Sequence, residues 1–453
     1  MVGVQVHEQA EPLAIAYGPR LVRIDRRSAA YLATLGRFGV VWLPSFALLS
    51  SRAPSLSGAV ILATGLSLVW FVTLHKAFGA ARLTLLALGP GIAAAVGTAT
   101  GAVITSALSF AIPLHLPERK LVELTLAIFV LSWAWEGLVH RSLAGCRRVV
   151  VIGAEECVAK VAADVDADDD APFEVVALID DEQLDEIGTQ IEMHRPDIVV
   201  LGSSELRPDA FERLLDIAGV GFKLVGVSEF YEHAFGRVPV ATLRPTWFMN
   251  VLHLYNRPYS RFAKRGFDLV VGTLGLVAVS WLLPVLWVVV RMTAGTGHVI
   301  FKQTRLGEGG KRFTIYKFRT MRVDAEAAGA VWASQDDPRI TRPGKFMRRT
   351  RLDELPQLIN VLKGDMSIVG PRPERPEFLE QLQGAVPFWS RRHLVKPGIT
   401  GWAQVRHGYT ADAEGTADKL SYDLWYLRHR SLVIDLTICV KTFTTLVTGS
   451  GAR

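Results

Sequence analysis

YLATLGRFGVVWLPSFALL, residues 31–49, is the first of four apolar runs in the N-terminal third of the chain. The other three extend over about residues 56–74, 83–108 and 121–139. Each is close to the roughly 20 residues that an α-helix needs to cross a bilayer. The third run is rich in Gly and Ala, which allows helices to pack closely in lipid. We therefore expect residues 31–140 to form a four-helix transmembrane bundle rather than buried helices of a soluble protein.

Basic residues are distributed unevenly around these runs. The segments before the first run, between the second and third, and after the fourth carry Arg20, Arg23, Arg26, Arg27, Lys76, Arg82, Arg141, Arg147 and Arg148. The opposite loops carry Arg52 in one case and Arg119 with Lys120 in the other. Because loops rich in Lys and Arg stay in the cytoplasm, both ends of the bundle are predicted to be cytoplasmic, including an N-terminal segment at 1–30.

The composition excludes several classes of protein. Of the 453 residues, 50% are hydrophobic and 21% charged, and the mean hydropathy is +0.26, which excludes a disordered or fibrous chain. The formal charge of +6 is too small to predict a nucleic-acid partner. The three cysteines, Cys146, Cys157 and Cys439, are odd in number and lack metal-ligand spacing. Neither a disulfide scaffold nor a zinc site is therefore expected.

Residues 147–245 alternate short β-rich and helical runs, beginning with RVVVIGAEE at 148–156. Alternation at this spacing is typical of a Rossmann-like parallel α/β domain. Its first strand should end at Gly153, but Glu155 and Val158 stand where a dinucleotide fingerprint has its second and third glycines. We expect a structural or regulatory module in preference to a nucleotide site.

A fifth apolar run, at about 267–290, has Lys264 and Arg265 before it and Arg291 after it. Basic residues on both flanks place both ends on the cytoplasmic side. Pro284 lies inside the run and removes one helical hydrogen bond, which favours a break in the helix. The run is therefore predicted to be a re-entrant membrane helix rather than a span.

Chemistry-bearing residues concentrate after residue 300. Asp353 and Glu354 are adjacent and follow Arg348, Arg349 and Arg351. Two carboxylates beside guanidinium groups could coordinate Mg²⁺ while the arginines hold phosphate oxygens, and a carboxylate can attack phosphorus directly. The alternative is structural, since an acidic pair also suits the N-terminus of a helix.

Three phrases in this region are long and specific. They are KFRTM (317–321), LDELPQLINVLKGDMSIVGPRP (352–373) and PGITGWAQV (397–405). Together they resemble the bacterial polyprenyl-phosphate sugar-1-phosphate transferases, the monotopic phosphoglycosyl transferases, over about residues 257–453. The preceding spans and α/β domain resemble the large, multi-domain branch of that family. The resemblance implies a C-terminal, mostly helical catalytic domain with a re-entrant helix, in which Pro284 marks the break.

The resemblance also implies a role for each site residue. Asp353 matches the nucleophile that attacks the sugar-linked phosphate of a UDP-sugar, and Glu354 matches its partner. Both would hold Mg²⁺, which neutralises the diphosphate. Basic residues that would bind the substrate phosphates are Lys317, Arg319, Arg348 and Arg372. UMP would leave, and undecaprenyl phosphate would take the phospho-sugar from the aspartate.

The expected location is the cytoplasmic face of the bacterial inner membrane, in contact with membrane lipids. The expected donor is a UDP-hexose with glucose or galactose, because the large branch generally uses unacetylated hexoses. The product would pass to downstream glycosyltransferases that build exopolysaccharide, capsule or O-antigen, and the bundle offers surface for a homodimer.

One alternative is a non-catalytic membrane sensor or assembly platform with a ligand-binding α/β domain. A membrane-bound nucleotide-sugar dehydratase is disfavoured, since no Tyr is followed four positions later by Lys.

Overall fold

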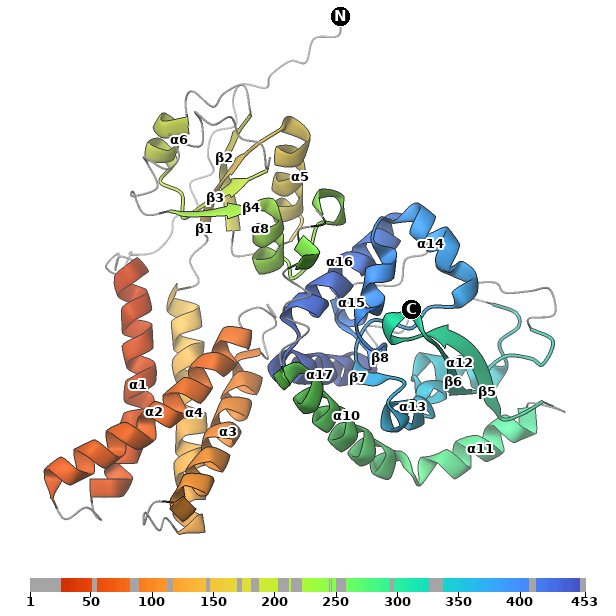
Figure 1. Cartoon of the computed structure of the whole chain (residues 1–453), viewed down its shortest axis with the longest axis horizontal. Helices are drawn as coiled ribbons and strands as arrows, with labels where there is room; N and C mark the ends of the chain where they lie inside the picture. The colour runs from red at the N-terminus through yellow and green to blue at the C-terminus, as the bar shows by residue number, and fades with distance from the viewer. Residues whose placement is uncertain are drawn as a thin grey trace, which may run out of the picture.

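The computed structural model describes residues 26–50, 55–81, 89–111, 117–143, 147–168, 173–180, 187–202, 212, 222–243, 245, 247–249, 258–293, 297–325, 337–406 and 413–448. Most of the predicted N-terminal segment 1–30 lies outside the described residues, as do Arg52, Arg82 and Cys146. Figure 1 shows three parts: a bundle of long helices, a small sheet with helices around it, and a larger part made mostly of helices.

The bundle confirms the four predicted apolar helices. They are α1 (Arg26–Ser50), α2 (Leu56–Ala81), α3 (Gly89–Ala111) and α4 (Glu118–Leu143), and each is long and apolar enough to cross a membrane. In α3, a Cβ added at Gly101 would lie 2.9 Å from the ring of Trp70, and one at Gly97 would lie 2.8 Å from Leu74. The glycines of the third run therefore do allow α2 and α3 to pack closely.

A four-stranded parallel sheet follows the bundle. Its strands are β1 (Arg147–Ile152), β2 (Phe173–Ile179), β3 (Ile198–Leu201) and β4 (Lys223–Gly226), in the order β2-β1-β3-β4. The helices around it are α5 (Glu155–Asp166), α6 (Ile187–His194) and α8 (Val227–Ala234). Side chains alternate along β1, so Val149 packs towards α5 and α8 whereas Val150 packs towards α6. Helices thus cover both faces of the sheet.

The C-terminal part holds short strands among helices. After the 3-10 turn η3 (Val240–Thr242) come α10 (Pro258–Val279), α11 (Leu282–Thr293), β5 (Ile300–Leu306), η4 (Glu308–Gly310), β6 (Arg312–Phe318), α12 (Arg342–Arg349), η5 (Leu352–Glu354), α13 (Gln357–Lys363), β7 (Ser367–Val369), η6 (Pro376–Phe378), α14 (Leu379–Ala385), η7 (Trp389–Leu394), β8 (Gly398–Thr400), α15 (Trp402–Arg406), α16 (Ala413–His429) and α17 (Leu432–Thr448). Strands β5 and β6 form an antiparallel hairpin, while β7 and β8 are parallel. The core of this part includes the fully buried Trp402 and Trp425.

The fifth apolar run forms a bent pair of helices. α10 and α11 meet at an angle of 65°, and the residues between them are Ser280 and Trp281. Pro284 is not at the bend itself but in the first turn of α11, where proline is tolerated. It cannot donate to the carbonyl of Ser280, four residues earlier, and this missing hydrogen bond favours a break between α10 and α11.

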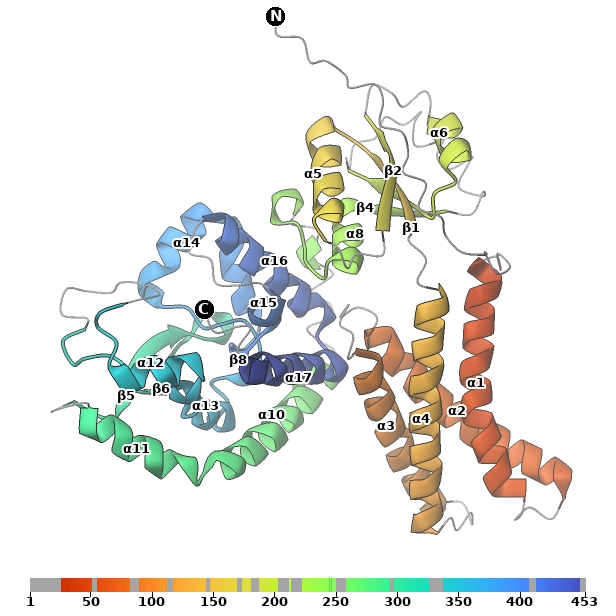
Figure 2. The ribbon, with the colours of Figure 1, turned by 180° about the vertical axis from the view of Figure 1, so that it is seen from behind.

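α17 joins the C-terminal part to the bundle. It contacts α10 on one side and α2 and α3 on the other, and Val433 is part of the bundle's hydrophobic core. Ile434 and Ile438 of the same helix belong to the core of the C-terminal part. Figures 1 and 2 show α17 beside the start of α10, with one end directed towards the bundle.

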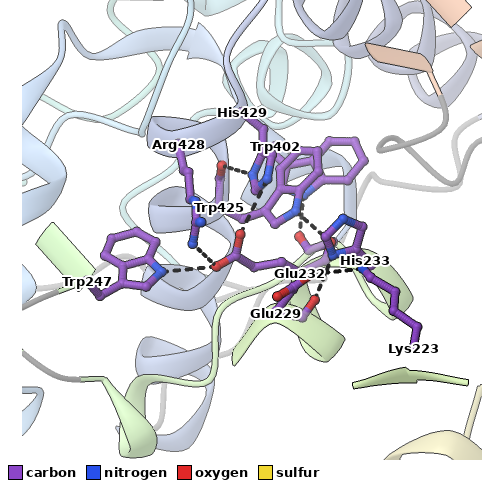
Figure 3. A network of polar contacts seen from close by, with 10 residues as sticks. Lys223, Glu229, Glu232, His233, Trp247, Trp402, Trp425, Arg428 and His429 are labelled. Carbon is purple, nitrogen blue, oxygen red and sulfur yellow. Dashed lines mark hydrogen bonds and ion pairs between the residues drawn. The ribbon is translucent and has the colours of Figure 1, made fainter. Parts of the chain in front are cut away.

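A buried carboxylate joins the sheet part to the C-terminal part. Glu232 of α8 is 2% exposed and accepts hydrogen bonds from Trp247 Nε1 at 3.0 Å and Arg428 Nη1 at 2.6 Å. Its backbone oxygen accepts from Trp425 Nε1 at 2.9 Å, and His429 Nε2 lies 3.3 Å from its second carboxylate oxygen. Figure 3 shows these side chains converging on Glu232 from α16 and from the segment after α8.

Replacing Glu232 with Ala should weaken this junction. The change removes the acceptor of Trp247 Nε1 and of the part-exposed Arg428, which costs about 1 to 3 kcal/mol. We expect a clear fall in the temperature of thermal unfolding, followed by tryptophan fluorescence. Glu229→Ala on the same helix is the matched control, because Glu229 and Lys223 form an exposed pair. Equal unfolding temperatures for the two variants would contradict the anchoring role.

Candidate active site

The pair Asp353 and Glu354 lies on the 3-10 turn η5, between α12 and α13. α12 starts at a capped end, where the hydroxyl of Thr341 accepts from the backbone N–H of Gly344 at 3.1 Å. The chain then reverses at Arg351, which has a left-handed backbone with φ of 57°. The reversal turns both carboxylates inward, and each residue is only 6% exposed.

The turn is fixed to the bent helix pair. Leu352 and Leu355, which flank the two carboxylates, pack against a cluster that contains Leu286 and Val290 of α11 and Met347 of α12. Apolar contacts on both sides of the pair therefore hold the carboxylates beside α11.

Three cations surround Glu354. Its Oε1 lies 3.1 Å from Lys317 Nζ, 3.1 Å from Arg372 Nη2 and 3.6 Å from Arg351 Nη1. Burial opposes the charged form, but Lys317 and Arg372 hold the pKa of Glu354 well below its usual range. The cations therefore favour the ionised form of Glu354.

The negative charge of Asp353 is neutralised less by nearby cations than that of Glu354. Burial first, and the neighbouring charge of Glu354 second, raise the pKa of Asp353 to about 6, while Lys317 and Arg348 oppose the rise. Within the described part of the chain, its Oδ1 is buried and has no hydrogen-bond partner. A carboxylate oxygen with no partner is free to bind a cation or to attack an electrophile.

The predicted basic residues fall into two groups. Lys317 and Arg372 lie directly on Glu354, as described above, and Arg348 acts electrostatically on Asp353 while its Nε donates to Thr320 Oγ1 at 2.9 Å. Arg319 points elsewhere: its Nε donates to the carbonyl of His298 at 2.8 Å. The structure thus brings Lys317, Arg348 and Arg372 to the pair, whereas Arg319 is directed to the carbonyl of His298.

Two further polar residues line the small cavity next to Glu354, together with Lys317 and Arg372. The first is Arg305, which donates to the carbonyl of Pro373 at 3.1 Å, and burial lowers the pKa of its guanidinium to about 10. The second is Gln357, whose Nε2 is buried without a partner among the described residues. Sequence analysis missed both. The available signal was weak: Arg305 occupies an inward position of a strand whose neighbours Lys302 and Thr304 face outward.

Arg372 is positioned by the close approach of β7 and β8. The N–H of Gly370 donates to the carbonyl of Thr400 at 2.9 Å, and the N–H of Gly398 donates to that of Pro371 at 2.9 Å. A Cβ at Gly370 would lie 2.3 Å from the carbonyl oxygen of Lys396, so no larger residue fits there. The glycines thereby set the path of the chain that leads into Arg372.

The chain beyond Arg372 is held by a buried guanidinium. Arg392 is 3% exposed and pairs with Glu374 at 2.9 Å and with Asp423 of α16 at 2.6 Å. The backbone oxygen of Glu374 accepts a hydrogen bond from the N–H of Leu306 at 2.9 Å. This network connects β5, the segment after β7, and α16.

The residues fit the predicted magnesium ion. Mg²⁺ is usually held by one or two carboxylates together with substrate phosphates. Asp353 offers a buried oxygen without a partner, and Glu354 is ionised beside it. Over the described ranges, no group of three or more His, Cys, Asp or Glu side chains could hold a metal ion. Asp365 lies just beyond the other end of α13, away from the pair.

The matched region of known proteins coincides with this site. Residues 259–449 match the family of bacterial sugar transferases. A UDP-N-acetylgalactosamine-undecaprenyl-phosphate N-acetylgalactosaminephosphotransferase of Aeromonas hydrophila is 42% identical over 50% of this chain and 53% of its own length. A UDP-glucose:undecaprenyl-phosphate glucose-1-phosphate transferase of Escherichia coli (strain K12) is 44% identical over 42% of each chain. The chain therefore spans about half the length of these two relatives.

A shorter relative is covered almost completely. The uncharacterized sugar transferase EpsL of Bacillus subtilis (strain 168) is 40% identical over 42% of this chain and 90% of its own length.

His393 beside Arg392 should make stability depend on pH. Burial, then the charge of Arg392, lowers the pKa of His393 to about 4, from 6.5 in an exposed histidine. Below pH 6.5 His393 becomes protonated in the unfolded chain, whereas in the folded chain it stays neutral until about pH 4. Its contribution to the free energy of unfolding is therefore fully present above pH 6.5 and is lost as the pH falls. The shift corresponds to about 3 kcal/mol at most.

Thermal unfolding of the purified protein at pH 7.5 and pH 4.5 checks this expectation. His393→Gln should lose part of the difference between the two pH values, whereas the exposed His233→Gln should retain it. A pH dependence that is the same in both variants would exclude His393 as its source.

Proposed function

The chain belongs to the bacterial sugar transferase family, and we propose that it transfers a hexose 1-phosphate from a UDP-sugar to undecaprenyl phosphate and releases UMP. The main support is the buried pair Asp353 and Glu354, in which one carboxylate is held ionised by three cations and the other has an unpartnered oxygen. The relatives from Aeromonas hydrophila and Escherichia coli bear names that describe this kind of transfer.

The proposed chemistry has two steps at one phosphorus atom. In the first step an oxygen of Asp353 attacks the sugar-linked phosphorus, the bond to the bridging oxygen breaks, and UMP leaves with the electron pair. In the second step an oxygen of undecaprenyl phosphate attacks the same phosphorus and frees the carboxylate of Asp353. Glu354 is the poorer nucleophile because its charge is already neutralised by Lys317, Arg351 and Arg372.

The basic side chains would stabilise the negative charge of the phosphates. Lys317, Arg348 and Arg372 are positioned for this role, with Arg305 as an addition, and Arg319 would need to leave the carbonyl of His298. Asp353 and Glu354 are the residues that would hold Mg²⁺, which when bound supplies charge neutralisation for the diphosphate.

The membrane arrangement is part of the same proposal. We assign the bent pair α10–α11 to a re-entrant helix, which keeps residues 257–453 on the cytoplasmic face of the inner membrane, where UDP-sugars are available. The 65° bend and the basic residues on both flanks support this assignment over a broken span. Residues 31–140 would anchor the chain among membrane lipids, and the sheet part at 147–245 would be a Rossmann-like regulatory module.

The sugar is proposed as glucose or galactose. The names of the relatives include N-acetylgalactosamine as well as glucose, at similar identities of 42% and 44%. The product would be the first lipid-linked unit of an exopolysaccharide, capsule or O-antigen, taken up by downstream glycosyltransferases. The bundle would also provide the surface for a homodimer.

Release of UMP tests the activity. The purified protein with Mg²⁺ should release UMP from one sugar in a panel of UDP-sugars, and turnover should depend on undecaprenyl phosphate. Asp353→Asn should reduce turnover by about 10⁴-fold or more, because an amide cannot act as the nucleophile. The control Asp324→Asn changes an exposed aspartate and should leave turnover intact.

Two results would contradict the proposal. Clear turnover by Asp353→Asn would show that another group attacks the phosphorus. A folded protein that releases no UMP from any sugar of the panel would favour the alternative function, a non-catalytic membrane platform.

Labelling of single cysteines tests the topology. A cysteine in place of the exposed Arg312 should resist an impermeant thiol reagent in whole cells, because β6 lies on the cytoplasmic side if α10–α11 re-enters. A cysteine in place of Ser55, between α1 and α2, should react and serves as the positive control. Both variants need a background without the native cysteines. Labelling at position 312 in intact cells would mean that the helix pair crosses the membrane.

A further inference from the structure

A second cavity, of about 770 Å³, lies at the start of α10 and shares no lining residue with the small cavity beside Glu354. Seven Lys and Arg side chains line it, against three Asp and Glu side chains. It opens at the far end of α13, so the length of that helix, roughly 10 Å, separates it from the carboxylate pair. The proposed transfer reaction gives this basic cavity no role.

Some of the charged side chains that line the cavity have partners within the fold. Lys264 Nζ lies 2.7 Å from Asp435 Oδ2, and Arg265 donates to the carbonyl oxygens of Val361 and Leu362, each at 2.7 Å, at the end of α13. Of the acidic residues, Asp268 accepts from Ser367 Oγ at 2.8 Å and from the N–H of Ile368 at 3.0 Å. These groups hold the fold together around the cavity.

Three cations have no such explanation. Among the described residues, the side chains of Lys311, Arg312 and Lys396 form no hydrogen bond or ion pair with the rest of the protein. Lys396 Nζ and Arg265 Nη2 lie 3.6 Å and 3.5 Å from the position of a Cβ on Gly364, so two positive groups come together at one point of the wall. Like charges gathered in a concave wall attract an anion.

In the proposed re-entrant arrangement of α10 and α11, the cavity lies where the chain meets the membrane. One wall is the first two turns of α10, which lead into the apolar part of that helix, with Phe262 82% exposed and Val270 59% exposed. Another wall includes Tyr426 and Arg430, next to the start of α17, which packs into the bundle. Lipid phosphates occupy this level of a bilayer, and basic clusters beside a membrane helix recognise them.

We propose that this cavity is a phosphate-binding site, occupied by the headgroup phosphate of a membrane lipid or by a free phosphate ion, and bound through Lys311, Arg312 and Lys396. Occupancy would neutralise the three cations and tie β6 and the segment before β8 to the membrane surface at the start of α10. Donors of this type form charge-assisted hydrogen bonds to phosphate oxygens.

The test measures binding to the purified full-length protein in detergent, independently of UMP release. Dihexanoyl phosphatidylglycerol, dihexanoyl phosphatidylcholine and inorganic phosphate at constant ionic strength are the probes, and the shift in unfolding temperature gives the apparent affinity. Lys396→Met combined with Lys311→Met should weaken binding at least tenfold, since both charge-assisted hydrogen bonds to the phosphate are lost. Lys160→Met, an exposed lysine of α5, is the matched control.

The outcomes separate the two sources. Binding of phosphatidylglycerol but not phosphatidylcholine, lost in the double variant, assigns the site to an anionic lipid headgroup. Binding of inorganic phosphate alone, with the same loss, assigns it to a free ion. If the double variant does not fold, Arg312→Gln on the exposed hairpin replaces it, with a loss of about tenfold expected. Affinities for all probes that are equal in wild type and cavity variants would overturn the proposal.

Discussion

The structure of the C-terminal part depends on keeping Glu354 ionised while it is buried. A buried carboxylate without compensation is too costly to persist, and the three cations that compensate it come from separate segments. Lys317 is on β6, Arg351 precedes η5, and Arg372 follows β7. These segments must therefore converge on one point, and the glycine-bearing strands β7 and β8 and the buried Arg392 are the means by which they do so. The positive charges stabilise ionised Asp353 less than they stabilise ionised Glu354. The two adjacent carboxylates therefore have different pKa values.

The difference between the two carboxylates is what a two-step transfer requires. A carboxylate neutralised by three cations is a weak nucleophile, whereas one with a raised pKa and an unpartnered oxygen is more basic and more available. The sequence shows only two neighbouring acids, so their separate roles came from resemblance to a family. The structure shows a physical difference between the two acids, because Lys317 and Arg372 lie on Glu354, whereas one oxygen of Asp353 has no partner among the described residues.

Much of the fold could be predicted because it is encoded locally. Runs of about 20 apolar residues identified the four helices of the bundle, and the strand pattern predicted the end of β1 at Gly153, one residue after its observed end at Ile152. The features that could not be predicted depend on contacts between residues far apart in the sequence. The bond from Arg428 to Glu232 joins positions 196 apart, and Arg305 enters the site only because β5 pairs with β6. The bend of α10–α11 falls at Ser280 and Trp281 because Pro284 acts on the carbonyl four residues before it.

The position of the carboxylates beside α11 limits where the proposed reaction can occur. An acceptor with a long polyprenyl chain keeps its tail in the bilayer, so its phosphate can reach a nucleophile only near the membrane surface. Leu352 and Leu355 tie the turn of Asp353 to Leu286 and Val290 of α11, and this apolar packing would set the depth of the proposed nucleophile. The bend of the helix pair has the same consequence, since a straight span would carry the following strands to the other side. In the proposed reaction, packing against α11 and the shape of the helix pair would together bring a buried carboxylate to a lipid phosphate.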